Sequence, residues 1–277
     1  MSARDLAAPD GPNIDPTYAR PMRDDFKIVA EVEPATRPDL VRVRHQIAAL
    51  SRVASSFLIP DNHIGRATVS SIAVAHEVAQ MGGDAVACLN ARDRNVLGFR
   101  RDLLTAAAYG VSQFLFVYGD RPETGRRSDD LTVRTMLDEA RRFEASAESN
   151  AVPLSLGVSA RIGPLPRWKQ QADALFVQVS FSVPDLVRWR EQIDFDGPVY
   201  VGVMAPPSAT MARKLSADIP QLAVPPALIQ ALESDRDAGV NFAYEMVTEV
   251  RESGAFEGVH LIPVSRYREL VALLDPI

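Results

Sequence analysis

The amino-acid sequence predicts a single (β/α)8 TIM barrel. Eight short apolar runs rich in Val, Leu, Ile and Phe alternate with amphipathic stretches, the order expected of a parallel sheet whose strands are linked by helices. The 277 residues, 47% of them hydrophobic, can bury one large core of this kind. Eight such units at this length are typical of a barrel whose active site lies at the carboxyl ends of the strands.

The eight predicted strands follow one another along almost the whole chain. They are residues 26–32, 54–60, 84–89, 112–118, 152–158, 173–179, 197–203 and 258–264. Apolar residues three and four positions apart predict helices over 66–81, 95–110 and 128–149. Gly110 stands where a left-handed residue is expected to end the second of these helices.

Two connections differ in length from the rest. Residues 159–172 leave room for barely two helical turns between the fifth and sixth strands. Residues 206–257 form the longest connection, with helical patterns in 225–239 and 240–254. A long connection at the barrel mouth usually covers a substrate, so we expect this one to do so.

Composition restricts the kind of protein. Residues 1–22, rich in Pro, Asp and Ala without periodicity, predict a flexible N-terminal arm ahead of a barrel domain over 23–277. No signal-peptide core and no apolar run of about 18 residues occurs, so no membrane partner is expected. The lone Cys88 excludes an intrachain disulfide and indicates a reducing, cytoplasmic location. A net charge of −6 without Lys/Arg runs argues against nucleic acid.

The first predicted strand ends in two carboxylates. In the sequence FKIVAEVEP, alternation puts Val29, Glu31 and Glu33 on one face and the residues between them on the other. One face of the strand therefore becomes acidic at its carboxyl end. A solvated strand end and a functional site both fit this pattern.

Polar residues also follow the other strands, but the sequence lacks the residues that several kinds of catalysis require. The three lysines stand at the start of the first strand or in connections, so no Schiff-base lysine is predicted. The four histidines show no His-x-His pair, and no metal site is predicted. Neither a Gly-x-Ser-x-Gly elbow nor a Gly-x-Gly-x-x-Gly fingerprint follows a strand.

Five segments resemble, in the same order, the methylenetetrahydrofolate reductase family. They are EVEP, NARDRNVLGFRRDLLTAAAYGV, YGDRP, VQVSF and VPPALIQAL, and the resemblance runs from about Phe26 to Leu274. It implies reduction of 5,10-methylenetetrahydrofolate to 5-methyltetrahydrofolate. The family's Glu-x-x-Pro acid falls on Glu31, its Gly-Asp aspartate on Asp120 and its sixth-strand glutamine on Gln178. These matches imply a catalytic acid and two pterin-binding residues.

Other residues at the mouth receive weaker assignments. Tyr118 could stack on a flat ring or simply pack, and a helix cap is the alternative role for Asp120. For the run Arg92, Asp93 and Arg94 we favour a salt-bridge cluster that shapes the loop, and for Glu33 a solvated carboxylate. The residues expected to contact a cofactor are Asn62, His63, Asn90, Gly119 and Arg161.

The sequence departs from the flavin-carrying members of that family. Those members usually have a histidine on the third strand, where this chain has Cys88, and a longer segment after the fifth strand that grips FAD. Here that segment reads SARIGPLPRWKQQA and lacks those residues. We therefore expect a short, flavin-independent member that takes hydride directly from NADH or NADPH. The alternatives are an FAD-dependent reductase and a non-catalytic folate-binding barrel subunit.

Overall fold

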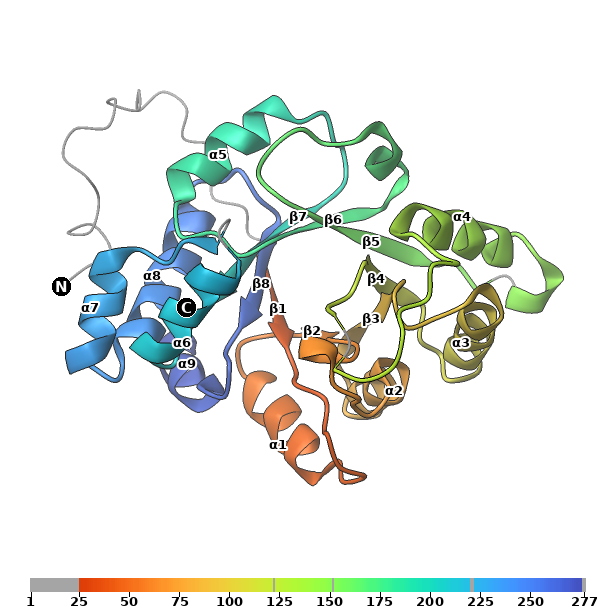
Figure 1. The fold of residues 1–277 in the computed structure, drawn as a ribbon, viewed down its shortest axis with the longest axis horizontal. Helices are drawn as coiled ribbons and strands as arrows, with labels where there is room; N and C mark the ends of the chain where they lie inside the picture. Colours follow the sequence, from red (N-terminus) through yellow and green to blue (C-terminus); the bar gives the residue numbers. More distant parts are fainter. Residues whose placement is uncertain (1–24, 122, 151, 220–221, 276–277) are drawn as a thin grey trace.

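The computed structural model describes residues 25–121, 123–150, 152–219 and 222–275 (Figure 1). The predicted arm over 1–22 lies outside the described residues. Eight parallel strands close into a barrel in chain order, which confirms the predicted TIM barrel. The strands are β1 (Lys27–Glu31), β2 (Ser56–Ile59), β3 (Asp84–Asn90), β4 (Gln113–Val117), β5 (Ser155–Ala160), β6 (Ala174–Val177), β7 (Val199–Met204) and β8 (Gly258–Ile262).

Helices surround the strands on the outside (Figure 1). They are α1 (Val41–Leu50), α2 (Ser71–Gln80), α3 (Val96–Ala108), α4 (Val133–Glu144), α5 (Val183–Gln192), α6 (Ala209–Asp218), α7 (Pro226–Ser234), α8 (Ala238–Glu252) and α9 (Tyr267–Leu274), with the 3-10 turns η3 (His63–Gly65), η4 (Ala147–Ser149) and η5 (Arg167–Gln171). The connection between β5 and β6 holds only η5, as its length predicted, whereas α6, α7 and α8 fill the connection between β7 and β8.

Local sequence explains where several helices begin and end. The side-chain oxygens of Asn95, Thr132, Ser182 and Ser208 accept a backbone N–H three residues ahead and so cap α3, α4, α5 and α6. Each such cap stabilises a helix by about 1 kcal/mol. Gly110 follows α3 with φ of +71°, which confirms the predicted left-handed end.

The helix predicted over 66–81 is too long at its start, because α2 begins only at Ser71. The N–H of Val69 donates to the carbonyl of Ala35, 2.8 Å away, and this contact keeps the segment before α2 extended. The tertiary contact therefore overrides the helical pattern of residues 66–70.

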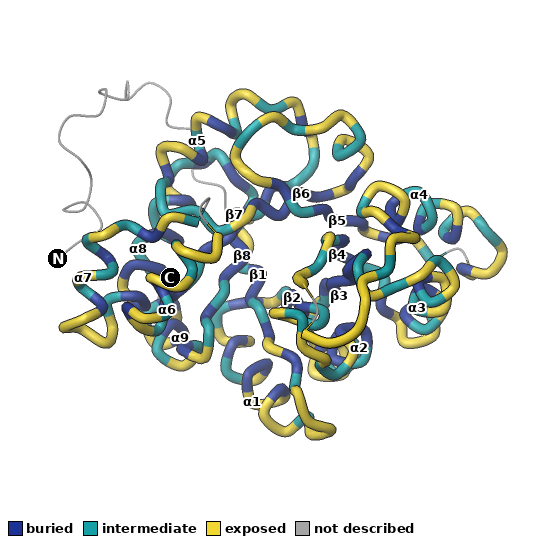
Figure 2. The backbone as a smooth tube through the Cα atoms, viewed as in Figure 1, coloured by how far each residue is buried: buried dark blue, intermediate teal, exposed yellow. Residues whose placement is uncertain are grey.

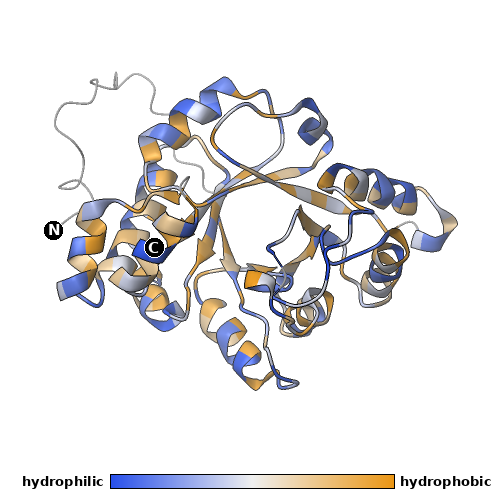
Figure 3. Cartoon of the chain, in the orientation of Figure 1, coloured by the Kyte–Doolittle hydropathy of each residue, from blue (hydrophilic) through white to orange (hydrophobic). Residues whose placement is uncertain are grey.

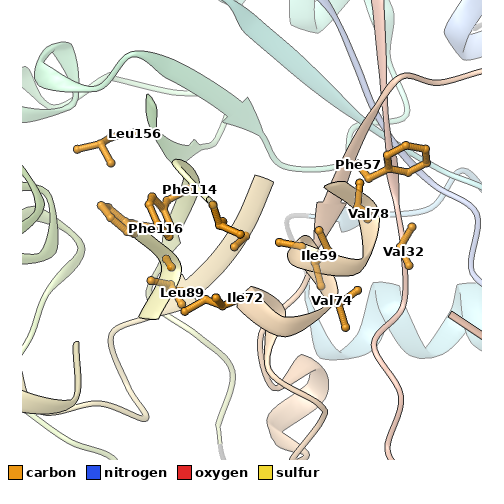
Figure 4. Packing of buried hydrophobic residues seen from close by; sticks show 14 of the residues in the cluster. Val32, Phe57, Ile59, Ile72, Val74, Val78, Leu89, Phe114, Phe116 and Leu156 are labelled. Atoms are coloured by element: carbon orange, nitrogen blue, oxygen red, sulfur yellow. The ribbon is translucent and has the colours of Figure 1, made fainter. Parts of the chain in front are cut away.

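The strands alternate between an outer face that packs on helices and an inner face that fills the barrel. Phe57, Phe114 and Phe116 point outward into a cluster that also contains Ile72 and Val74 of α2 (Figure 4). Fully burying a side chain of this kind contributes roughly 2 to 3 kcal/mol. A smaller inner cluster contains Val29, Leu58, Val86, Cys88, Leu115, Ala174 and Phe176. The strands are accordingly buried in Figure 2 and hydrophobic in Figure 3, while the β4–α4 connection is hydrophilic.

Strand register fixes the height of the acidic residue of β1. If the paired residues are followed from strand to strand around the barrel, the path returns to β1 at a position shifted by about eight residues. This shift is the stagger of a TIM barrel. This stagger puts Glu31, Cys88, Ser159 and Gly202 in one layer near the carboxyl ends of the strands. Gly202 lies tightly against the backbone of Val177, since a Cβ there would stand 2.7 Å from the carbonyl oxygen of that residue.

Among the described residues, no helix is long and apolar enough to cross a membrane. In the same part of the chain, no three His, Cys, Asp or Glu side chains form a group that could hold a metal ion.

Candidate functional site

Glu31 points into the barrel and lies beside an imidazole from β8. Val29 belongs to the inner cluster and Ala30 to the outer one, so Glu31, which shares the face of Val29, points inward. The Oε2 atom of Glu31 is 3.1 Å from Nε2 of His260, and the two side chains are only 16% and 11% exposed. Glu33, by contrast, is a solvated carboxylate, 59% exposed.

Sequence reasoning gave His260 no role. Its Nε2 is buried, and the contact with Glu31 does not have hydrogen-bond geometry, so this nitrogen has no hydrogen-bond partner among the described residues. The imidazole meets the ring of Phe176 edge-on, with 6.1 Å between ring centroids. His260 was detectable in principle, because it is the only polar side chain in the run GVHLIPV.

The thiol of Cys88 shares the layer of Glu31. Burial, and after it the negative charges of Glu31 and Asp61, raise the pKa of this thiol well above its usual range. A thiol in such surroundings keeps its proton at neutral pH and is a poor nucleophile. Cys88 therefore contributes packing to the inner cluster.

A buried polar cluster lies at the end of β3. The Asn90 side chain donates to Asp61 and to Asp93, both at 2.8 Å, and accepts the N–H of Asp93 at 2.9 Å. Arg94 contacts Asp61 and donates to Asp102 at 2.8 Å. Burial by itself lowers the pKa of Arg94, but these two carboxylates outweigh it and raise the pKa.

The salt-bridge cluster expected of Arg92, Asp93 and Arg94 forms at Arg94 alone. Asp93 is held by the amides of Asn62 and Asn90 instead, and Arg92 lies over the Tyr118 ring. Asn90 is only 1% exposed, and its side-chain amide group and carbonyl oxygen are already hydrogen-bonded within the protein. Its predicted cofactor contact would have to compete with these bonds.

The loops after β2 and β4 are tied together. Asn62 adopts a left-handed conformation with φ of 48° and donates to Asp93 at 2.9 Å. The Oδ2 atom of Asp120 accepts the N–H of Ile64 at 3.0 Å, and both residues are exposed. Asp120 therefore caps a turn of the β2 loop, and its Oδ1 makes no hydrogen bond with any described residue. His63, in the same turn, is exposed.

Tyr118 lies between two arginines at the end of β4. The guanidinium of Arg92 covers one face of its ring at 4.7 Å from the centroid, and Arg127 donates to its hydroxyl at 3.1 Å. The ring is 46% exposed. Stacking on a flat ligand would therefore use the face that Arg92 leaves open.

Gln178 corrects one expectation. The sixth strand, predicted over 173–179, places Gln178 within the strand, but β6 ends at Val177 and the Gln178 side chain is exposed. Residues two positions apart in a strand share a face, and Phe176 belongs to the inner cluster, so Gln178 points toward the mouth of the barrel.

Gln178 also lines a groove of about 590 Å³ between the β5–β6 and β6–α5 connections. Arg161, Phe181, Arg188, Trp189 and Pro225 are among the other residues of this groove. Arg161 is exposed and makes no ion pair with any described residue. Burial, and then the charge of Arg161, lower the pKa of nearby Lys169, whose Nζ donates to the Ser159 carbonyl at 2.6 Å.

The predicted residues thus form two groups with Glu31 separate from both. Asn62, Asn90, Gly119 and Asp120 gather over the ends of β2 to β4, and Arg161 and Gln178 share the groove beyond β5 and β6. In the described part of the chain, no hydrogen bond or ion pair joins Glu31 to either group. A ligand that contacts all three would have to span the mouth.

Comparison with known proteins finds solved structures with a similar fold but assigns this chain to no family. No family model matches the sequence, and no curated protein matches it. A Clostridium thermocellum protein that binds two copies of 5-methyl-5,6,7,8-tetrahydrofolic acid has a similar structure, with a TM-score of 0.62 and 12% identity over 92% of this chain and 96% of that chain.

Two other solved structures are similar over most of their length. DmoA from Hyphomicrobium sulfonivorans has a TM-score of 0.53 and 10% identity, covering 92% of this chain and 88% of that one. The spore cortex-lytic enzyme SleL from Bacillus cereus has a TM-score of 0.54 and 10% identity, and the match covers 90% of this chain and 73% of that one. At these identities the likeness concerns the fold alone.

Proposed function

We propose that this protein reduces 5,10-methylenetetrahydrofolate to 5-methyltetrahydrofolate, with NADH or NADPH as the direct hydride donor. The observation that carries the proposal is the carboxyl group of Glu31, which lies inside the barrel at the carboxyl end of the first strand. It belongs to the EVEP segment that resembles the reductase family. The Clostridium thermocellum barrel supports a folate ligand, because it binds 5-methyltetrahydrofolate, the product of this reaction.

Glu31 would supply the proton that the reaction needs. The methylene carbon of the substrate bridges N5 and N10, and a proton delivered to N10 allows the bond from N10 to that carbon to break. The N5-iminium cation that results accepts a hydride at the methylene carbon and becomes the N5-methyl group. Apolar neighbours such as Val29 and Leu58 lower the local dielectric, so the carboxylate left on Glu31 stabilises the cation more than it would in water.

Asp120 and Gln178 would hold the pterin. The pyrimidine edge of folate presents a ring N–H and an amino group side by side, and a carboxylate accepts from both. Asp120 uses one oxygen on Ile64 and keeps the other. The Gln178 amide makes no side-chain hydrogen bond with any described residue, so it can both donate to and accept from the ring.

The hydride donor would enter from the side of β5 and β6. A volume of about 590 Å³ lies within the range of small-molecule sites. Arg161, with no carboxylate partner among the described residues, suits a phosphate of the dinucleotide. The β5–β6 connection lacks the long helical segment that grips FAD in the resembling family, which favours direct use of NADH or NADPH.

The test compares Glu31→Gln with the control Glu33→Gln, which removes a carboxylate two residues away in solvent. Oxidation of NADH or NADPH is followed with 5,10-methylenetetrahydrofolate, and mass spectrometry identifies the product. We expect Glu31→Gln to lower kcat at least about 100-fold, since a general acid contributes 10²–10⁴-fold. The Kd for 5-methyltetrahydrofolate should change less than threefold, and Glu33→Gln should behave as wild type.

Three results would contradict the proposal. Equal activity of wild type and Glu31→Gln would remove the acid from its role. A flavin absorption spectrum, with activity lost when the flavin is stripped, would favour the FAD-dependent reductase. Folate binding without turnover would favour a binding subunit.

A further inference from the structure

We propose that His260 is a positioning residue for Glu31, an inference that rests on the proposed function. It holds the Oε2 oxygen of the carboxyl group, so that the Oε1 oxygen faces the mouth and carries the proton to the substrate. The imidazole does not reach the substrate itself in this proposal. Its role is to fix one orientation of Glu31 and to donate a hydrogen bond to the carboxylate after the proton has left.

Strand pairing brings the two residues together. β8 closes the barrel against β1, and His260 is the register partner of Val29. Glu31 stands two residues farther along on the same inner face, which makes the pair diagonal neighbours across the two strands. The 3.1 Å between Nε2 and Oε2 follows from this register.

The nitrogen that faces Glu31 has no other use. Nε2 is buried and makes no hydrogen bond with any described residue. Buried polar atoms are nearly always hydrogen-bonded, so an orphaned nitrogen next to a carboxylate oxygen needs an explanation. A small rotation of either side chain would complete the bond.

Among the described residues, Glu31 is the acidic group within ion-pair distance of His260. Phe176 of β6 lies edge-on to the imidazole, and Leu58 of β2 is apolar. Cys88 of β3 belongs to the inner cluster, and Tyr200 of β7 packs against it. Burial raises the pKa of both, with the charge of Glu31 adding to the shift at Cys88 and that of Glu257 at Tyr200, so both stay uncharged at neutral pH.

The kinetic test uses two substitutions of different chemistry. His260→Leu removes the nitrogen, whereas His260→Gln keeps an N–H donor at nearly the same distance from the backbone. We expect His260→Leu to lower kcat about tenfold or more with the KM for 5,10-methylenetetrahydrofolate within threefold, and His260→Gln to recover most of kcat. Tyr200→Phe is the control, since it removes a half-buried hydroxyl of the interior that does not touch Glu31.

Circular dichroism melts check that each variant is folded. A wild-type kcat in His260→Leu would overturn the proposal. Equally low kcat in folded His260→Leu and His260→Gln would also overturn it, because packing alone would then explain the loss.

A second measurement does not depend on turnover. The protein has only four histidines, so the imidazole ¹⁵N signals can be assigned by substitution and compared between wild type and Glu31→Gln at one neutral pH. We expect the His260 signals to move and those of His45, His63 and His76 to stay. Unmoved His260 signals would overturn the inference. Moved signals in a protein without reductase activity would keep the Glu31–His260 pair and defeat the proposed function.

Discussion

The backbone of Gly119 lies directly against the side chain of Asn90. A Cβ built on Gly119 would stand 2.8 Å from the Asn90 Cβ and 3.0 Å from its amide carbon. Asn90 cannot move aside, because its amide is hydrogen-bonded to Asp61 and Asp93. The loop that carries Asp120 is therefore seated on the buried polar cluster of β3, and only glycine permits this contact.

We expect Gly119→Ala to destabilise the fold more than Gly125→Ala. Both glycines have positive φ, 92° and 83°, but nothing lies within 4 Å of a Cβ on Gly125. Backbone strain alone should cost Gly125→Ala about 1 kcal/mol, and the clash should bring Gly119→Ala to about 2 to 3 kcal/mol. Urea unfolding measures both. Equal losses would show that Asn90 yields to the added methyl group.

Much of this architecture was predictable, because it depends on local pattern. All eight strands formed where apolar runs predicted them, and alternation along β1 correctly put Glu31 on the same face as Val29. The short β5–β6 connection also followed from its length alone. These features depend on the period of two in a strand and on chain length, which a sequence contains directly.

Features that depend on pairing between distant segments were not predictable in the same way. His260 gains its neighbour only when β8 closes against β1, more than two hundred residues earlier in the chain. Gln178 looked buried because its neighbours are apolar, yet β6 ends one residue before it. The link from Asp120 to Ile64 joins two loops whose approach depends on the register of three strands.

Ile64 is strained, and its replacement by glycine should not weaken the fold. Its φ of 58° is unfavourable for a β-branched residue, and its side chain is 60% exposed, so little burial would be lost. We expect Ile64→Gly to change the free energy of unfolding by about 0 to +1 kcal/mol in the stabilising direction. Thermal and urea denaturation test this.

Leu104→Gly is the matched control for Ile64→Gly. Leu104 is 46% exposed and lies in the interior of α3, where the backbone is helical. Glycine there should destabilise by about 1 kcal/mol or more. A comparable loss in both variants would show that the Ile64 side chain, and not its backbone, matters for stability.

Arg161 should matter for the nicotinamide substrate and less for folate. If its guanidinium meets a phosphate, Arg161→Gln removes a charge-assisted hydrogen bond worth about 1.5 kcal/mol or more, or roughly a tenfold rise in KM for NADH or NADPH. Arg188→Gln is the control, because Arg188 lines the same groove but is already paired with Asp185. Initial rates at varied concentrations of each substrate separate the effects. A rise in the folate KM alone would assign Arg161 to folate instead.

The buried thiol of Cys88 should make the fold less stable in alkaline solution. Burial, with the charges of Glu31 and Asp61, raises the pKa of this thiol in the folded protein, whereas an unfolded cysteine titrates near 8.5. Below about pH 8.5 both states keep the proton, and the contribution of Cys88 to stability is complete. As the pH rises further, only the unfolded state releases its proton, so the free energy of unfolding falls by about 1 kcal/mol between pH 8.5 and 9.5. Urea unfolding of wild type and Cys88→Ala at pH 7.0, 8.5 and 9.5 tests this, since the alanine variant should lack this part of the decline. Parallel pH dependence in the two proteins would show that the thiol loses its proton as readily in the folded barrel as in the unfolded chain.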